Sequence, residues 1–302
     1  TGGVAQQVLR FRAIAAGTSD LRLVYRRPWE ADAPPLATFA ATVTGGGSFT
    51  GAYVPRPTPT PAPAPRLAVE PAYDVNGQAL PAHFNWCEQG GCTPVKDQGG
   101  CGSCWAFATV GVLELNIKMK DGVTKDLSEQ YLVSCNTKNF GCDGGWWAHD
   151  YHQDSIPPSQ SAAGAVYESD FPYTALDATT TSPRTPCQWY LDHHERISAW
   201  AYVSGGDPDA VPSVAAMKQA LYTYGPLAVA VCVSTQFNLY MGGVFRTDET
   251  ADCEGGTNHG VVLVGWDDTD GAWYLRNSWG PAWGESGYMR IEYGVSRVGE
   301  AA

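Results

Sequence analysis

The sequence of 302 residues has few charged side chains, and most of these are acidic. Only 17% of its residues are charged and 44% are hydrophobic, which excludes a chain that is disordered throughout. The formal net charge of −12 disfavours nucleic acid and anionic membrane surfaces as partners. No stretch approaches the roughly 20 apolar residues of a membrane span. Because the first residue is Thr rather than Met, we expect a processed or truncated product.

The sequence also lacks the paired cysteine motifs of a structural zinc site. Among its nine cysteines only Cys101 and Cys104 have the C-x-x-C spacing, and His193–His194 make a poor second half of a site. We therefore expect neither a metal nor a cofactor. Eight cysteines can pair and leave one thiol free, and four disulfides would indicate an oxidising compartment. The nine are Cys87, Cys92, Cys101, Cys104, Cys135, Cys142, Cys187, Cys232 and Cys253.

Composition divides the chain into three regions. Residues 1–50 contain "VLRFRA", "LRLVY" and "ATFAATV", whose alternation of apolar and polar residues predicts β-strands. The segment "PRPTPTPAPAPR" alternates proline with small residues and favours a semi-rigid polyproline II linker. We therefore expect a β segment over residues 1–50, a linker over 51–72 and a main domain over 73–302.

The main domain begins with helical patterns and ends with strands. "CWAFATVGVLELNIKMK" predicts a mostly buried helix, with Ser103 placed to cap it. After about residue 225, "LAVAVCV", "GVVLVGW", "AWYLRNSW" and "GYMRIEY" predict strands separated by turns. This order indicates an α+β fold with two halves, and ligands usually bind in the cleft between such halves.

The segment "DQGGCGSCWAF" places Cys104 in the first turn of the predicted helix. Unpaired backbone N–H groups and the helix dipole favour an anion there, and so favour thiolate over thiol. The glycines around it let a substrate backbone approach closely. Gln98 is placed to bind an oxyanion together with the backbone N–H of Cys104.

A nucleophilic thiol needs a base, and His259 in "TNHGVVLVGW" is the candidate among six histidines. The other five have no supporting pattern, although a histidine at the start of an apolar strand can also be a satisfied core residue. Asn277 follows eighteen residues later, where adjacent antiparallel strands would bring its carboxamide to the His259 ring. Trp279 is placed to shield that contact from water. Cysteine, histidine and asparagine thus have the order of an acyl-transfer triad.

Long segments of the main domain resemble the papain family of cysteine peptidases, from about residue 80 to about residue 299. The matching segments are "QGGCGSCWAF", "LSEQYLVSC", "GCDGGW", "ESDFPYTA", "NHG" and "NSWGPAWGESGYMRI". The resemblance implies a papain-like two-lobed fold, with a helical lobe and a β-barrel-like lobe. It also implies that Cys104 is the nucleophile, His259 the base, Asn277 the orienting residue and Gln98 the oxyanion donor. In that family the nucleophilic cysteine and the base form a thiolate–imidazolium pair, and the pKa of the thiol lies far below its ordinary value. Papain itself is the example from which this rule on thiol pKa values is taken.

The resemblance further implies substrate contacts and two disulfides. Small residues at 230 and 260 would leave room for a bulky apolar P2 side chain, whereas Trp147 would narrow the mouth of the pocket.

Family members commonly bridge the position of Cys253 to a cysteine near the C-terminus, but none exists here. We therefore expect Cys232–Cys253 and Cys87–Cys92 for the remaining cysteines. The implied disulfides are Cys101–Cys142 and Cys135–Cys187, and the implied substrate-binding residues are Gly144, Gly145, Trp146, Trp147, Ala230, Asn258, Gly260 and Trp279.

The first region resembles a different family. "LRLVYRRPWE" is similar to a loop of chagasin-like inhibitors of cysteine peptidases, which have an immunoglobulin-like all-β fold. About the C-terminal half of such a domain is present, and it is too small to bury a core alone. We therefore expect an inhibitory pro-region that docks on the active-site cleft through Arg27, Pro28 and Trp29. A β adaptor that shares the loop is the alternative.

These features predict a cysteine endopeptidase made as a zymogen, with protein or peptide substrates. A papain-like exopeptidase or transpeptidase is one alternative, and an inhibitor or binding protein acting through its N-terminal region is another. The four expected disulfides predict a secreted or extracytoplasmic location, with a lysosome-like compartment as the alternative.

Overall fold

The computed structural model describes residues 18–25, 37–44, 71–158, 160–177, 187, 191–254 and 256–302. The chain divides into two compact units, Thr1–Ala64 and Pro65–Ala302, and this division falls within the predicted linker. None of the helices in the described part of the chain has the length and apolar character needed to cross a bilayer.

The first unit contains a two-stranded antiparallel ribbon. Strands β1 (Thr18–Tyr25) and β2 (Ala37–Thr44) pair so that Thr18 lies opposite Thr44 and Tyr25 opposite Ala37. These strands cover two of the three predicted strand segments. The third, "VLRFRA", and the tripeptide of residues 27–29 lie outside the described residues.

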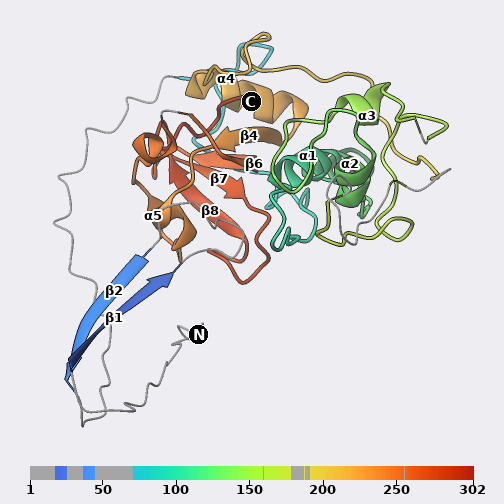
Figure 1. The fold of residues 1–302 in the computed structure, drawn as a ribbon. Helices are drawn as coiled ribbons and strands as arrows, with labels where there is room; N and C mark the ends of the chain where they lie inside the picture. The colour runs from blue at the N-terminus through green and yellow to red at the C-terminus, as the bar shows by residue number, and fades with distance from the viewer. Residues whose placement is uncertain are drawn as a thin grey trace. The chain divides into compact units, whose positions relative to one another are not determined.

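In the second unit α1, α2 and α3 lie together on one side, and the sheet lies on the other side with α4 and α5 beside it (Figure 1). The long predicted helix is confirmed as α1 (Cys104–Asp121), and Gly122 ends it in the left-handed conformation that glycine favours. The other helices are short or pack against the sheet. They are α2 (Glu129–Cys135), α3 (Asp150–Gln153), α4 (Val214–Tyr224), α5 (Thr235–Asn238) and the 3₁₀ helix η1 (Thr250–Cys253).

The sheet has six strands, and β6 (His259–Asp267) is its longest. One edge of β6 pairs with β4 in its first half and with β3 in its second half, while β7 pairs along the opposite edge. All pairs are antiparallel except β5 with β8. The other strands are β3 (His83–Asn85), β4 (Leu227–Val231), β5 (Val244–Phe245), β7 (Ala272–Arg276) and β8 (Tyr288–Glu292).

Strand β6 separates two hydrophobic cores. Because successive side chains of a strand point to opposite faces, Val262 and Val264 enter the core around α1 and α2. Val261, Leu263 and Trp266 enter a second core, which also includes residues of α4. The predicted division into two halves is therefore built around one strand that is buried on both faces.

The capping prediction for Ser103 is wrong. Helix α1 does begin directly after Ser103, but the Ser103 hydroxyl makes no capping hydrogen bond and lies 2.6 Å from the hydroxyl of Tyr173. Ser128 and Ser213 do cap their helices, by accepting hydrogen bonds from backbone N–H groups three residues later.

Two of the histidines without a supporting sequence pattern are buried. His149 precedes α3 and His152 lies within it, and both side chains are almost fully enclosed. Burial lowers the pKa of His149 to about 4 and that of His152 to about 3, so both rings are neutral at ordinary pH. Neither ring can act as a cation at neutral pH.

Close contact between β3 and β6 predicts a specific sensitivity to substitution. A Cβ at Gly265 would overlap the backbone of Phe84 and Asn85, so Gly265→Ala forces the two strands apart. We expect it to lower the free energy of unfolding by about 2 kcal/mol. Gly256→Ala is the control, because its Cβ would lie 3.6 Å from the Cys253 carbonyl oxygen, an ordinary contact. Denaturant unfolding in a Cys104→Ser background measures both, and equal stability of the two variants would contradict the prediction.

Candidate active site

Cys104 is the free thiol of the chain. It is the first residue of α1, and the other eight cysteines form four disulfides. The pairs coincide with those expected from the sequence. They are Cys87–Cys92, Cys101–Cys142, Cys135–Cys187 and Cys232–Cys253.

Opposing effects act on the ionisation of Cys104. The backbone N–H groups of Cys104, Trp105 and Gly260 hydrogen-bond the sulfur and favour the thiolate. Burial of the sulfur outweighs them and raises the pKa of the thiol above its ordinary value. The N–H groups at the start of α1 therefore act in the expected direction, but desolvation opposes them and is the larger effect. A cation beside the sulfur is needed to reverse the balance.

His259 and Asn277 lie on adjacent strands and contact each other. His259 begins β6, Asn277 directly follows β7, and His259 Nε2 lies 2.8 Å from Asn277 Oδ1. The same oxygen accepts a hydrogen bond from the backbone N–H of Ser278 at 2.8 Å. With this bond the ring donates through Nε2, which leaves Nδ1 as the nitrogen that can accept a proton. The Trp279 ring covers the imidazole, with the ring centroids 4.8 Å apart.

Gly260 brings the start of β6 against the start of α1. Its N–H reaches the Cys104 sulfur, and a Cβ at this position would lie 3.3 Å from the Cys104 carbonyl oxygen. Since His259 directly precedes Gly260, the close approach of the two backbones brings the imidazole to the region of the thiol. A side chain at residue 260 would push these two elements apart.

Gln98 is held next to the same region by the segment that follows Asn277. Its backbone N–H donates to the Ser278 carbonyl at 2.8 Å, and its Oε1 accepts from the Ser278 hydroxyl at 2.7 Å. Its Nε2 donates one hydrogen to the Cys101 carbonyl at 2.9 Å and carries a second. Because both ends of the amide are fixed, the second N–H has a defined direction.

Sequence reasoning missed Ser278 and Tyr173, two side chains that hold Gln98 in place. The Tyr173 hydroxyl donates to the Gln98 carbonyl at 2.8 Å and contacts the Ser103 hydroxyl next to Cys104. Both residues lie inside segments that resemble papain-family motifs, "ESDFPYTA" and "NSWG". The motifs were the available signal, but nothing in them shows which of their hydroxyl groups point toward Gln98.

Gly144 and Gly145, the adjacent glycines of "GCDGGW", are each required for a different structural reason. Gly144 has a φ of +123°, and its N–H donates to the Gly141 carbonyl in a tight turn. A Cβ at Gly145 would lie 2.6 Å from the Trp105 ring, so the chain can pass over this indole only without a side chain. The turn therefore presents bare backbone beside the start of α1.

The expected pocket beside Gly260 is partly filled. The Trp147 ring lies 3.1 Å from where a Gly260 Cβ would stand, and its N–H donates to the Ala301 carbonyl. Trp147 and Ala230 are both buried members of the core around α1. Trp146 is half-buried and donates to the Tyr202 hydroxyl. The Trp147 ring thus occupies space that the small residues were expected to leave open.

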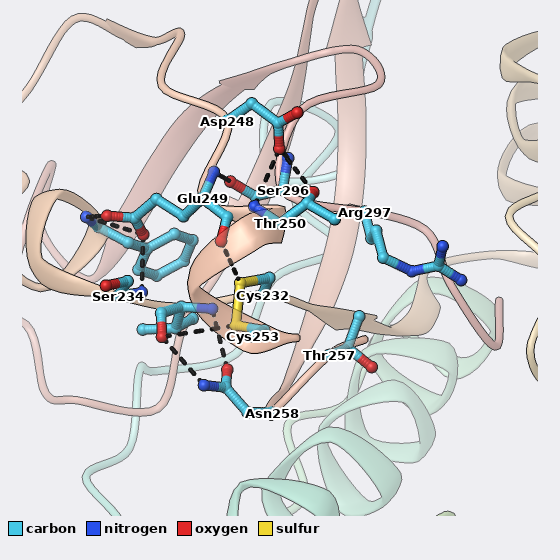
Figure 2. Close-up of a disulfide and its surroundings, with 12 residues drawn as sticks. Cys232, Ser234, Asp248, Glu249, Thr250, Cys253, Thr257, Asn258, Ser296 and Arg297 are labelled. Atoms are coloured by element: carbon cyan, nitrogen blue, oxygen red, sulfur yellow. Dashed lines mark hydrogen bonds between the residues drawn. A yellow bond between two sulfur atoms is a disulfide. The ribbon is translucent and has the colours of Figure 1, made fainter. Parts of the chain in front are cut away.

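The Cys232–Cys253 disulfide anchors the loop that leads into His259. Figure 2 shows it with Asn258, whose Oδ1 accepts from the Val233 N–H at 2.9 Å and whose Nδ2 donates to the Val233 carbonyl at 3.0 Å. Nearby, the buried Glu249 carboxylate accepts from backbone N–H groups at the start of α5. The Asn258 side chain is therefore engaged with Val233, and any substrate contact is left to its backbone.

Comparison with family models matches residues 80–301 to the papain family cysteine proteases. Among curated proteins, cysteine endopeptidase RepA of Oryza sativa subsp. japonica is 40% identical over 222 residues, covering 72% of this chain and 53% of the relative. Senescence-specific cysteine protease SAG12 of Arabidopsis thaliana is 34% identical over 226 residues, covering 74% and 59%. The chain thus spans little more than half the length of these relatives.

Solved structures show the same similarity. The bromelain protease from Ananas comosus in complex with the E64 inhibitor is 28% identical with a TM-score of 0.56, covering 74% of this chain and 96% of that chain. The ragweed pollen allergen Amb a 11, a cysteine protease solved in its proform, is 32% identical with a TM-score of 0.60, covering 76% and 65%.

The anchoring of Asn258 predicts that the Cys232–Cys253 disulfide matters for activity as well as stability. Replacing both cysteines by serine removes a cross-link between residues that are 21 positions apart in the sequence. We expect the free energy of unfolding to fall by about 3 kcal/mol. We also expect a roughly tenfold lower kcat/KM for a peptide substrate, because His259 follows the loosened loop. The matched control replaces Cys87 and Cys92, which are 5 residues apart, with an expected loss of about 2 kcal/mol and unchanged kcat/KM. Equal kinetics of both double variants would contradict the positioning role.

Proposed function

Because this chain belongs to the papain family of cysteine proteases, we propose that it is an endopeptidase that uses Cys104 as nucleophile. The observation that carries the proposal is the position of Cys104. It is a free thiol at the start of α1, against Gly260, the residue next to the hydrogen-bonded pair of His259 and Asn277. This arrangement has the parts of an acyl-transfer site, namely a nucleophile, a base and a group that orients the base.

The proposed reaction proceeds through an acyl-enzyme. The Cys104 thiolate attacks the scissile carbonyl carbon, and the imidazolium of His259 protonates the leaving amine. Water deprotonated by His259 then attacks the thioester, which releases the acid and regenerates the thiol. Asn277 Oδ1 accepts the hydrogen bond of His259 Nε2 and keeps Nδ1 directed to the reacting groups.

Gln98 is the proposed side-chain donor to the oxyanion. One hydrogen of its Nε2 bonds the Cys101 carbonyl, and the second is available for the oxygen of the tetrahedral intermediate. The backbone N–H of Cys104 is the proposed second donor. Ser278 and Tyr173 fix Gln98 before substrate binds, so the donor needs little reorganisation during the reaction.

The remaining contacts with substrate are also proposals. Gly144 and Gly145 would let the substrate backbone pass close to the turn, and Trp279 would cover the His259 side of the cleft. Trp146 and Gly260 would contact the P2 side chain. Because Trp147 fills space beside Gly260, we propose that the P2 side chain meets a shallow apolar surface.

The first region is the proposed inhibitor of the main domain. The similarity of "LRLVYRRPWE" to chagasin-like inhibitors supports this, with Arg27, Pro28 and Trp29 as the docking residues. A linker of about a dozen residues gives a high effective concentration, so weak docking suffices. Four disulfides support a secreted or lysosome-like compartment, where such bonds persist.

The proposed ion pair predicts how the alkylation rate of Cys104 depends on pH. In the wild type, imidazolium of His259 stabilises the thiolate, so alkylation by iodoacetamide should remain fast below pH 6. In His259→Ala, burial without a cation raises the thiol pKa, so the rate should rise only above the ordinary thiol value of about 8.5. Peptide hydrolysis by this variant should fall by more than 10³-fold.

E-64, the inhibitor bound to the solved bromelain, checks the assignment of the nucleophile. It should label Cys104 stoichiometrically and abolish peptide hydrolysis, while Cys104→Ser should neither react nor hydrolyse peptide.

The matched control for the pH profile is His83→Ala, because His83 is exposed and pairs with Glu88 and Asp267. Identical pH profiles for wild type and His259→Ala would rule out the ion pair, and label on another residue would rule out the nucleophile.

Inhibition by the first region predicts that cutting the linker activates the enzyme. A site for a specific protease placed within residues 55–66 allows cleavage in the full chain, followed by dilution to nanomolar concentration. We expect at least tenfold higher activity after cleavage and dilution, because the effective concentration of the docked region is lost. The same chain left uncut is the control, and Trp29→Ala should activate without cleavage. Unchanged activity in both cases would refute the inhibitor role.

A further inference from the structure

A small cavity lies beside Asn277, between the core around α1 and the sheet. Its volume is about 20 Å³, more than the roughly 10–15 Å³ that a single water molecule needs. Its wall combines apolar residues with several charged and polar side chains, which offer the partners that a buried water needs. The lining residues used below are Lys96, Gly111, Glu114, Glu129, Arg276 and Asn277.

Asn277 brings an unsatisfied donor to this wall. Its side chain is buried, at 3% exposure, and its Oδ1 already accepts from His259 and from the Ser278 N–H. Its Nδ2 has no hydrogen-bond partner among the described residues. Buried amide donors in proteins are nearly always paired with protein or with ordered water. A water in the cavity that Asn277 lines would supply this partner.

Glu129 is the lining carboxylate with unused acceptor capacity. Its two oxygens accept from Lys96 Nζ at 3.0 and 3.3 Å, whereas a carboxylate has about four acceptor positions. Glu114 is more fully engaged, because its oxygens contact Lys96, the Leu127 N–H and the Thr93 hydroxyl. Burial raises the pKa of Glu129, while the charge of Lys96 opposes this and favours the carboxylate.

We propose that a water molecule in this cavity accepts a hydrogen bond from Asn277 Nδ2 and donates one to the Glu129 carboxylate, so that Glu129 is a positioning residue for Asn277. The water gives Asn277 Nδ2 its missing acceptor and uses an acceptor position of Glu129 that Lys96 leaves free. It also fixes the carboxamide against a flip, since a flipped amide would present Nδ2 to His259 and lose the acceptor for the ring N–H. Glu129 acts only through Asn277. The kinetic consequence rests on the proposed function.

A crystal structure of the full chain carrying Cys104→Ser, at 1.5 Å or better, tests the water directly. We expect ordered density within 3.2 Å of both Asn277 Nδ2 and a Glu129 oxygen. A dry cavity would overturn the proposal. This result does not depend on activity, so it separates failure of the inference from failure of the proposed endopeptidase function, which is decided by wild-type hydrolysis and Cys104 labelling.

Substitutions at Glu129 test the positioning role. Glu129→Met removes the acceptor at similar volume, and we expect a roughly tenfold lower kcat with KM unchanged. Glu129→Gln keeps an acceptor oxygen without the charge and should recover most of the activity. Asp126→Asn is the matched control, because Asp126 contacts the same Lys96 but lies outside the cavity, exposed to solvent. It should behave as the wild type. Equal loss in the Met and Gln variants would show that only the charge matters, which would overturn the proposal.

Gly111→Ala tests the same cavity with a substitution that should not disturb folding. Gly111 lies within α1 and lines the cavity, and its Cβ would have one neighbour within 4 Å, the Val262 side chain at 3.5 Å. Alanine favours the helix, so the melting temperature should hold or rise. The added methyl group occupies part of the cavity volume. We therefore expect kcat to fall, as it should in Glu129→Met. Wild-type kcat with the water displaced would overturn the proposal.

Discussion

The second unit depends on the burial of β6 on both of its faces. A strand with one solvated face would alternate polar and apolar residues, whereas "GVVLVGW" is apolar almost throughout and sends side chains into two cores. The helical core and the sheet core can both form only if this strand lies between them. Its first residue is His259 and the next is Gly260, which touches Cys104. The packing that joins the two cores therefore also sets where the imidazole meets the thiol.

The electrostatics of Cys104 follow from the same burial. Placing the start of α1 against β6 removes water from the sulfur, which raises the thiol pKa despite three backbone N–H groups around it. In a polar, open site those N–H groups would favour the thiolate more effectively. The low-dielectric environment also strengthens the attraction between a thiolate and an imidazolium, since Coulomb energy rises as the effective dielectric constant falls. In the proposed mechanism the site is therefore poorly ionised without its histidine and strongly ionised with it.

Features that depend on local pattern could be predicted from the sequence, and features that depend on long-range packing could not. The helix from Cys104 and the strands after residue 225 followed from periodicity. The His259–Asn277 contact followed from strand adjacency. The resemblance predicted that Trp147 narrows the pocket, but not that its ring fills the space beside Gly260, because no sequence pattern shows which way a buried indole points. The lost cap at Ser103 has the same cause, since Tyr173, seventy residues away, competes for its hydroxyl.

Cys104 is the ninth cysteine of a chain with four disulfides, and its thiol has to stay out of any disulfide. Cys101 is only three residues from Cys104, but it is closed with Cys142, and the loop passes so close to Cys142 that a side chain at Gly102 would overlap its carbonyl oxygen. With all eight other cysteines paired, no thiol remains within the chain to form a disulfide with Cys104 directly. Exchange would require the Cys104 thiolate to attack an existing disulfide, and partial burial of the sulfur limits this. The disulfides therefore do more than stabilise the fold, because they also leave the reactive thiol without a partner.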